Sequence, residues 1–401
     1  MCSTENDTPT NNRVSRPMYQ RVILGLIFCI AFSSSLASEP KGFQVPRTEI
    51  VPIKDSVSDG QYELYIKLPQ TYSDSSKTHY PVIYFTDADW HIEQLSVAQE
   101  YLLNDVILVG ISWQKDMPAN LINEVGPYVS RFRDYTLLET KNADRQTKYQ
   151  FGKASSHLRF IREQVIPYVE KNYRTNPHNR SYFGYSAGGE FGSYITVAQP
   201  DTFKNYILGS PSLKGSIPYL TELLSNSKSK HVEIGANIYI THGSLEQELN
   251  GYVDQYLALL NSTGSEKLFI SKVEIEGSHQ TAFPMTGVRG VSWLSNLINE
   301  ALAEPTDVTF RDLSPLKLEF VDASPADLND SIPVGVLGHD AGEQGMILAL
   351  AREIADQIYA RVDSLLIAHK GKLLFESYYL RGRRNMAHPQ ASATKAYTGL
   401  A

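Results

Sequence analysis

Short apolar runs alternate with amphipathic stretches through residues 61–302. The runs have the length and the β-branched and aromatic content that are typical of strands. They are Gln61–Leu68, Tyr80–Phe85, Asp105–Ile111, Ser181–Tyr185, Tyr206–Leu208, Asn237–Ile240 and Leu268–Ile275. The stretches with helical spacing are Ser155–Tyr173, Ala187–Ala198, Ile217–Leu224, Leu245–Leu260 and Val288–Leu302. This alternation predicts an α/β fold, with a mostly parallel sheet and helices on both of its faces.

The C-terminal part of the chain follows a different pattern. Loop-like composition near residues 304–332 predicts a boundary, so we expect a first domain at 45–303, a linker at 304–333 and a second unit at 334–401. In that unit Ala341–Tyr359 has helical periodicity, and Ser364–Leu380 predicts two strands joined by a turn. The pattern indicates a small, incomplete α+β segment.

The N-terminal segment is typical of a targeting sequence. Three arginines precede the apolar run Val22–Phe32, which is too short to span a bilayer, and Ser35-Leu36-Ala37 suits signal peptidase. We therefore interpret residues 1–37 as a secretory signal peptide and expect a periplasmic or secreted protein without a stable membrane anchor. An uncleaved anchor is the alternative.

Composition excludes several classes of function. The net charge is -7 and no basic block occurs, which argues against a nucleic-acid partner. Both cysteines, Cys2 and Cys29, lie in the predicted signal peptide. A mature chain without cysteine has no thiol nucleophile, no disulfide and no cysteine-ligated metal site.

One motif carries candidate chemistry. The hexapeptide Gly184-Tyr185-Ser186-Ala187-Gly188-Gly189 lies between a predicted strand and a predicted helix. This is the G-x-S-x-G spacing of a nucleophile elbow, in which small residues allow a sharp turn that exposes one serine hydroxyl. The motif predicts Ser186 as a nucleophile. A glycine-rich turn that only packs is the alternative.

A serine hydroxyl needs a base, and the base needs an acid that orients it. In this architecture they follow the nucleophile in the order acid, then histidine. His279 follows the last predicted core strand and is our candidate base, the alternative being a surface histidine. Glu246 is the first candidate acid, ahead of Glu248 and Asp254. Acidic residues are also favoured at helix N-termini, so a purely structural role for these glutamates stays open.

An oxyanion hole requires two backbone N–H groups. We expect one from Ala187, directly after the nucleophile, and the other from Ala88 or Asp89 in the loop after Tyr80–Phe85. Asp87 and Asp89 lack a clustered third ligand, so they are weak candidates for a metal site. We predict neither a metal nor an organic cofactor.

Together these segments resemble the putative-esterase family of α/β-hydrolases, which includes esterase D, enterochelin (siderophore) esterases, feruloyl esterases and mycolyltransferases. The resemblance covers roughly residues 45–303. It rests on Tyr80–Tyr84 with Asp87–Trp90, Arg133-Asp134-Tyr135-Thr136, the elbow, Ser210-Pro211-Ser212, Gly277-Ser278-His279 and Phe283-Pro284. It implies the α/β-hydrolase fold and a small-molecule ester as substrate. Arg133 would contact an acyl or carboxylate group, or form an ion pair with Asp134.

Residues 341–401 resemble the start of the class C β-lactamase and penicillin-binding group. The hairpin Leu365–Leu373 and the S-x-x-K spacing of Ser392 and Lys395 carry this resemblance. A lysine one helical turn after a serine can draw off the hydroxyl proton. The family also requires motifs further downstream, so we expect a truncated domain that is inactive.

The sequence thus predicts an exported serine hydrolase that cleaves carboxylic esters through an acyl-enzyme. The alternatives are an acyltransferase or peptidase on the same fold, a non-catalytic binding module, or a β-lactamase-like activity of the tail. Residues Ser112–Phe151 interrupt the strand–helix alternation and are rich in charged and aromatic side chains. We interpret them as an excursion over the active-site edge, or else as a surface insertion without function.

Overall fold

A computed structural model describes residues 44–72, 78–228, 233–303, 309–328, 331–359 and 361–386. The predicted signal peptide lies outside the described residues, as do Ser392 and Lys395 of the S-x-x-K motif. Within the described residues, no helix is long and apolar enough to cross a membrane.

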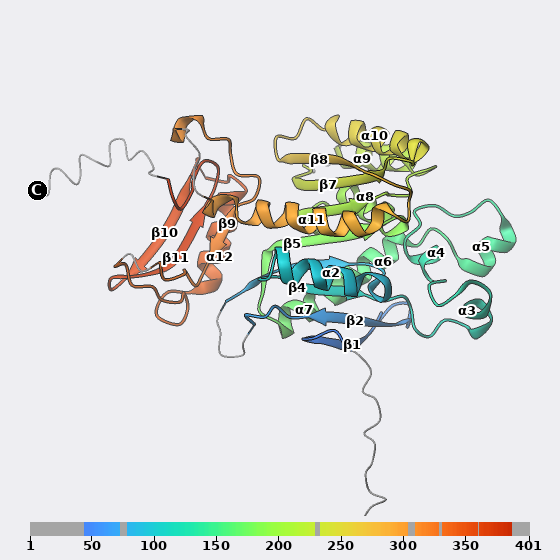
Figure 1. The fold of residues 1–401 in the computed structure, drawn as a ribbon, viewed down its shortest axis with the longest axis horizontal. Coiled ribbons are helices and arrows are strands. Elements are labelled where there is room, and N and C mark those ends of the chain that lie inside the picture. Colours follow the sequence, from blue (N-terminus) through green and yellow to red (C-terminus); the bar gives the residue numbers. More distant parts are fainter. Residues whose placement is uncertain are drawn as a thin grey trace, which may run out of the picture. The chain divides into compact units, whose positions relative to one another are not determined.

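The described residues form one large sheet and one small one (Figure 1). The strand order of the large sheet is β1-β2-β4-β3-β5-β6-β7-β8. Its strands are β1 (Thr48–Lys54), β2 (Gln61–Lys67), β3 (Tyr80–Phe85), β4 (Ile107–Ile111), β5 (Thr175–Tyr185), β6 (Asn205–Gly209), β7 (Ala236–Gly243) and β8 (Leu268–Ile275). The β1–β2 and β2–β4 pairs are antiparallel, and all pairs from β4 to β8 are parallel. The predicted α/β fold is therefore confirmed.

Both faces of the large sheet are covered by helices, because its central strands are apolar on both sides. Along β3, Val82 and Tyr84 belong to one buried cluster, whereas Ile83 and Phe85 belong to the other. This alternation follows from the two-residue period of a strand. Burial of strands on both faces is typical of parallel sheets.

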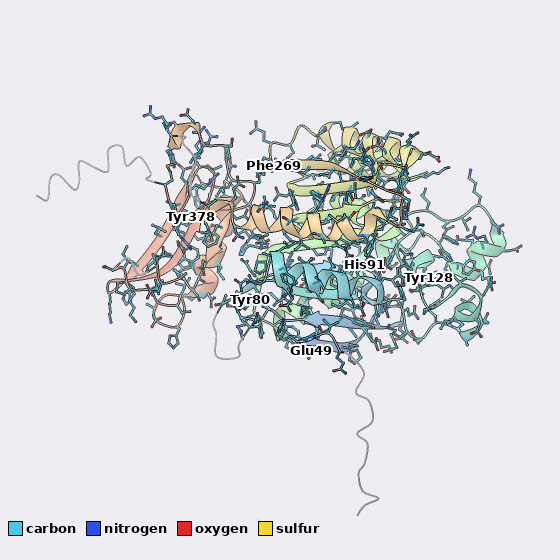
Figure 2. All side chains as sticks on the ribbon, viewed as in Figure 1. Glu49, Tyr80, His91, Tyr128, Phe269 and Tyr378 are labelled. Atoms are coloured by element: carbon cyan, nitrogen blue, oxygen red, sulfur yellow. The ribbon has the colours of Figure 1, made fainter. Side chains whose placement is uncertain are left out.

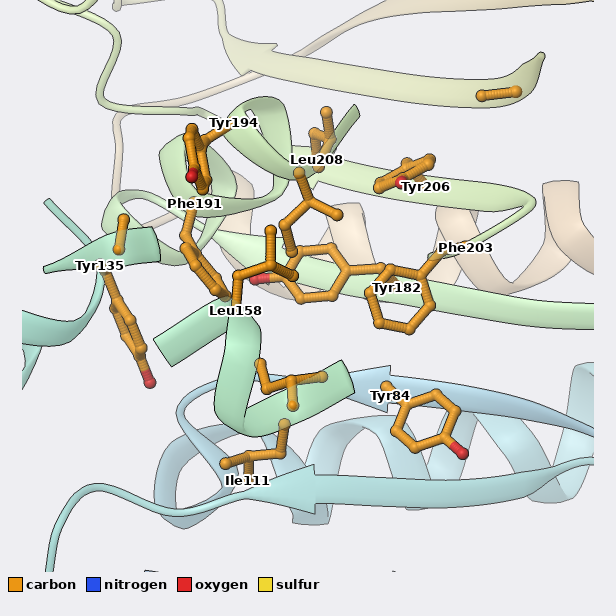
Figure 3. Packing of buried hydrophobic residues seen from close by; sticks show 14 of the residues in the cluster. Tyr84, Ile111, Tyr135, Leu158, Tyr182, Phe191, Tyr194, Phe203, Tyr206 and Leu208 are labelled. Carbon is orange, nitrogen blue, oxygen red and sulfur yellow. The ribbon is translucent and has the colours of Figure 1, made fainter. Parts of the chain in front are cut away.

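Two helices, α2 (Ala88–Leu102) and α11 (Ala282–Ile298), lie side by side on one face of the sheet (Figure 1). The other face is covered by α6 (Ala154–Phe160), η1 (Ile161–Val165), α7 (Ile166–Asn172), α8 (Ala187–Ala198), α9 (Ile217–Lys228) and α10 (Gln247–Asn261). Figure 3 shows the aromatic part of this second cluster, in which Tyr182 lies close to Phe203 and Phe191.

Three local features differ from the sequence prediction. The first strand, β1, falls in a segment for which we predicted no strand, and α2 begins inside the predicted oxyanion loop. The predicted helix Ser155–Tyr173 contains a π-helical turn at η1. Pro167, at the start of α7, lacks the N–H that a regular helix would donate to Glu163, which accounts for the irregular turn.

The interruption at residues 112–151 contains α3 (Ala119–Val125), α4 (Arg131–Asp134) and α5 (Ala143–Tyr149). It leaves the carboxyl end of β4, and Ser186 follows the carboxyl end of β5. Because these strands run parallel within one sheet, the excursion begins at the same sheet edge as Ser186.

The C-terminal unit contains the predicted helix and hairpin. The helix is α12 (Gln344–Ala355), and the hairpin strands are β10 (Ser364–His369) and β11 (Lys372–Tyr378). Its turn residues Lys370 and Gly371 both have positive φ, as a tight hairpin turn requires. A third strand, β9 (Phe320–Asp322), pairs with β11, so part of the predicted linker is a strand of the small sheet. Short helices η2 (Glu300–Leu302) and η3 (Phe310–Asp312) precede β9.

Candidate active site

Ser186 occupies a strained turn between β5 and α8. Its φ of 58° and ψ of -116° lie outside the regions that non-glycine residues normally adopt. Two glycines make the turn possible: a Cβ on Gly184 would lie 2.3 Å from the Gly188 carbonyl oxygen, and one on Gly188 would lie 2.5 Å from Thr86 Oγ1. The chain therefore has the geometry of a nucleophile elbow.

His279 and Glu246 are in direct contact. The imidazole Nδ1 lies 2.5 Å from Glu246 Oε1. Glu246 follows β7 and His279 follows β8, and these neighbouring parallel strands bring their C-terminal loops together. The other two candidate acids lie elsewhere, because Glu248 pairs with Lys214 at 2.8 Å and Asp254 pairs with Lys272 at 2.6 Å.

The second oxygen of Glu246 is also held. Oε2 accepts hydrogen bonds from Ser210 Oγ at 2.6 Å and from the Gly243 N–H at 2.7 Å. Burial would raise the pKa of Glu246, but the hydrogen bonds from Ser210, Gly243 and His279 outweigh burial and hold this pKa below its usual range. Glu246 is therefore a carboxylate that is fixed in place beside the imidazole.

Tyr185 links the elbow to the histidine loop. Its hydroxyl lies 2.6 Å from the His279 carbonyl oxygen and 3.1 Å from Ser210 Oγ. Burial raises the pKa of Tyr185 to about 12, so the hydroxyl keeps the single proton that it can donate to either neighbour. No role was predicted for Tyr185 or Ser210, although both belong to motifs on which the family resemblance rests.

Ser186 and His279 line one cavity, but they are not hydrogen-bonded in this structure. Ser186 Oγ lies 3.2 Å from Ser212 Oγ, and among the described residues no hydrogen bond joins it to the imidazole. Because Glu246 holds Nδ1, Nε2 is the imidazole nitrogen left for the nucleophile. Such contacts are often long without substrate and tighten in the reacting complex.

The cavity has a volume of about 450 Å³. The lining residues with rings are Trp90, His91, Tyr185, His279 and Phe283, and the others are Arg131, Ser186 and Gln280. Figure 2 shows His91 on α2 and Tyr128 of the excursion at the same end of the large sheet, consistent with the 5.3 Å between the Trp90 and Tyr128 rings. The excursion thus contributes directly to the cavity through Arg131.

His91 is a wall of the cavity rather than a second base. Its Nδ1 lies 2.9 Å from the Thr86 carbonyl oxygen, and its ring stacks on Phe283 at 4.9 Å. Burial lowers the pKa of His91 to about 4. The ring is therefore neutral at pH 7 and donates the Nδ1 proton to the carbonyl.

The three candidate oxyanion residues begin helices. Ala88 and Asp89 open α2, and Ala187 opens α8. First-turn amides have no acceptor within their own helix, and no described residue outside it accepts from these three. None of the three lines the cavity, although their neighbours Trp90 and Ser186 do. Among the described residues, these three amides therefore keep N–H groups without a protein acceptor.

The two aspartates at the start of α2, Asp87 and Asp89, are each paired with a cationic side chain. Asp87, which is fully buried, accepts from Trp113 Nε1 at 2.6 Å and from Arg131 Nη2 at 3.1 Å. Asp89 lies 2.7 Å from Lys115 Nζ. Among the described residues no group of three or more His, Cys, Asp or Glu side chains is arranged to hold a metal ion.

Of the two neighbouring arginines, the structure brings Arg131 to the cavity. Arg133 forms an ion pair with Asp134 at 2.7 Å and also donates to Tyr62 and Gln114. The residue predicted to contact an acyl or carboxylate group was Arg133, and no role was predicted for Arg131. Both lie in one short helix, and only the partners of each side chain distinguish them.

The model of the "Putative esterase" family matches residues 56–302, more than half of the chain. Ferri-bacillibactin esterase BesA of Bacillus subtilis (strain 168) is 27% identical over 220 residues, which is 51% of this chain and 73% of that protein.

Two solved structures share the fold. The BES protein from Bacillus cereus superimposes with a TM-score of 0.54 at 23% identity, covering 64% of this chain and 98% of its own. An IroE-like serine hydrolase from Shewanella oneidensis superimposes with a TM-score of 0.54 at 19% identity. The match covers 66% of this chain and 84% of that protein. The chain therefore has the α/β-hydrolase fold and belongs to the Putative esterase family.

Proposed function

We propose that this protein is a serine hydrolase that cleaves carboxylic esters through an acyl-enzyme. The observation that carries the proposal is the contact between His279 Nδ1 and Glu246 Oε1, at 2.5 Å. His279 also lines the same cavity as the strained Ser186. A buried carboxylate that holds one imidazole nitrogen leaves the other as a base for the serine.

In this mechanism Ser186 Oγ attacks the ester carbonyl carbon while His279 Nε2 accepts the hydroxyl proton. Glu246 stabilises the imidazolium that forms, and the amides of Ala187 and of Ala88 or Asp89 receive the developing oxyanion. His279 then returns the proton to the leaving alcohol. Water attacks the acyl-enzyme by the same route and releases the acid.

The substrate class to test first follows from the relatives. BesA is named for the ester of a ferric siderophore, and its similarity spans 73% of its length. We therefore propose a siderophore-type ester as substrate. The predicted signal peptide extends the proposal to action outside the cytoplasm, which N-terminal sequencing of the mature protein, expected to begin after Ala37, would test.

The reaction class is tested with 4-nitrophenyl esters. Wild type is expected to show a burst of 4-nitrophenolate, which reports acyl-enzyme formation. Ser186→Ala is expected to lose at least about 10³-fold in kcat. Because the Ser212 hydroxyl lies 3.2 Å from that of Ser186, Ser212→Ala identifies which one reacts and should keep the burst. A burst that persists in Ser186→Ala overturns the proposal.

A further inference from the structure

Arg131 places a positive charge in the cavity, and the proposed ester hydrolysis does not require this charge. It lies at the start of α4, in the excursion, and lines the same cavity as Ser186 and His279. No aspartate or glutamate is among the described residues that line this cavity. A ligand in this cavity can therefore contact the guanidinium, and among the described lining residues no carboxylate competes for it.

Asp87 holds the Arg131 guanidinium in place. Its Nε lies 2.7 Å from Asp87 Oδ1, and its Nη2 donates to Asp87 Oδ2 at 3.1 Å. Asp87 is fixed in turn by the indole N–H of Trp113. The carbon at the centre of the guanidinium also lies 4.9 Å from the centre of the Trp90 ring and 5.6 Å from that of Tyr135. These contacts fix the plane of the guanidinium before any ligand binds.

Part of the guanidinium has no protein partner. No hydrogen bond from Nη1 to any described residue is present, and the Arg131 side chain is 17% exposed. Arg133 contrasts with it, since its nitrogens donate to Asp134, Tyr62 and Gln114. A fixed guanidinium with free N–H groups in an aromatic cavity is suited to an anionic oxygen, which gives short, charge-assisted hydrogen bonds.

We propose that Arg131 binds an anionic oxygen, a carboxylate or phenolate, on an aromatic acyl group of the ester, and thereby selects anionic over neutral substrates. The inference rests on the proposed hydrolase function. Trp90, Tyr185 and Phe283 supply the walls for the ring, and Arg131 supplies the group that recognises its charge. Arg131 is thus a specificity residue, distinct from the groups that carry out proton transfer.

The test compares 4-nitrophenyl 4-carboxybenzoate with 4-nitrophenyl benzoate, which differ by one carboxylate. The measured quantity is the ratio of their kcat/KM values. Wild type should favour the carboxylated ester by about tenfold or more, and Arg131→Gln should lower the ratio by a similar factor. Arg131→Lys keeps the charge without the planar fork and should give an intermediate ratio. An unchanged ratio in Arg131→Gln overturns the inference.

Three further measurements keep the test decisive. Lys214→Gln removes a positive charge from an exposed side chain outside the cavity and should leave the ratio unchanged. If Arg131→Gln fails to fold because Asp87 stays buried and unpaired, Asp87→Asn/Arg131→Gln removes both charges and should show the same lowered ratio. Inhibition of wild type needs no variant: benzoate should inhibit about tenfold more strongly than benzamide, and equal inhibition contradicts the inference.

The outcomes separate this inference from the proposed function. Hydrolysis of both esters by wild type with equal kcat/KM contradicts the role of Arg131 and leaves the serine hydrolase intact. Failure of wild type to hydrolyse either ester contradicts the proposed function, and the inference falls with it.

Discussion

Glu246 and Glu248 lie two residues apart in sequence but differ in burial and in hydrogen-bond partners. Glu246 is largely buried and bound to His279, Ser210 and Gly243, whereas Glu248 is exposed beside Lys214. Glu246→Gln should lower kcat for a 4-nitrophenyl ester by about 10²–10⁴-fold, because an amide does not stabilise the imidazolium.

Glu248→Gln is the matched control, since it makes the same chemical change two residues away. It should keep kcat within about twofold, as expected for a change at an exposed position. Equal kcat losses in both variants, or a loss confined to Glu248→Gln, would contradict the assignment of Glu246.

Glu190 predicts a pH dependence of stability. It lies in α8, four residues after Ser186, is 8% exposed and accepts a hydrogen bond from Ser216. Burial raises its pKa from 4.5 to about 7. Between these values the folded chain binds a proton that the unfolded chain has released, so this group's contribution to stability falls as pH rises from 4.5 to about 7.

Glu190→Gln should therefore be more stable than wild type at pH 8, by at most roughly 3 kcal/mol, because no buried charge has to form. The glutamine keeps a carbonyl that accepts from Ser216, and the advantage should be much smaller at pH 4.5. Urea unfolding at both pH values measures the difference. An advantage of the same size at both values argues against the raised pKa.

At the residue scale, chain order and strand ends were sufficient to predict that His279 and Glu246 meet. Each follows a strand of the parallel part of the sheet, and such loops gather at one edge. The partners of Ser210, Tyr185 and Arg131 were not predictable. Those contacts depend on side-chain directions at the end of β5, after β6 and in α4, which spacing along the chain does not determine.

At the scale of the elements, the turn between β5 and α8 requires glycine at position 184, which adding one methyl group tests. A Cβ at position 184 would lie 2.3 Å from the Gly188 carbonyl oxygen, which belongs to the backbone and has little freedom to move. Gly184→Ala should lower the free energy of unfolding by about 1–3 kcal/mol, the usual cost of overpacking.

Gly251→Ala is the control, because a Cβ there meets no described atom within 4 Å and the residue lies inside helix α10. It should be neutral or stabilise by up to about 1 kcal/mol, since alanine is the better helix former. Thermal unfolding of both variants gives the comparison. Wild-type stability in Gly184→Ala would show that the turn does not require glycine.

The central strands of the large sheet, which are buried on both faces, were predicted from their apolar runs. β4 is buried at every position and was predicted from its apolar run. β1 has no buried position and is held by its pairing with β2, so its sequence shows no strand signal. Helix α2 was missed, since its first residues, Ala88 and Asp89, were assigned to the loop that follows Tyr80–Phe85.

At the scale of the whole molecule, the chain combines an α/β-hydrolase domain with a small antiparallel sheet at its C-terminal end. The family match ends at residue 302, before the small sheet begins at β9. The hairpin of that sheet was predicted from its alternating pattern and turn residues. The β-lactamase-like resemblance stays a prediction, because Ser392 and Lys395 lie outside the described residues.

The chain therefore offers two candidate nucleophiles, and the central claim is that Ser186 is the one that reacts. The most direct test is labelling of the full chain with a fluorophosphonate, followed by intact mass and peptide mapping. Wild type should gain one adduct, located on Ser186, and Ser186→Ala should gain none. An unlabelled wild type, or an adduct on Ser392 or another residue that persists in Ser186→Ala, would contradict the account.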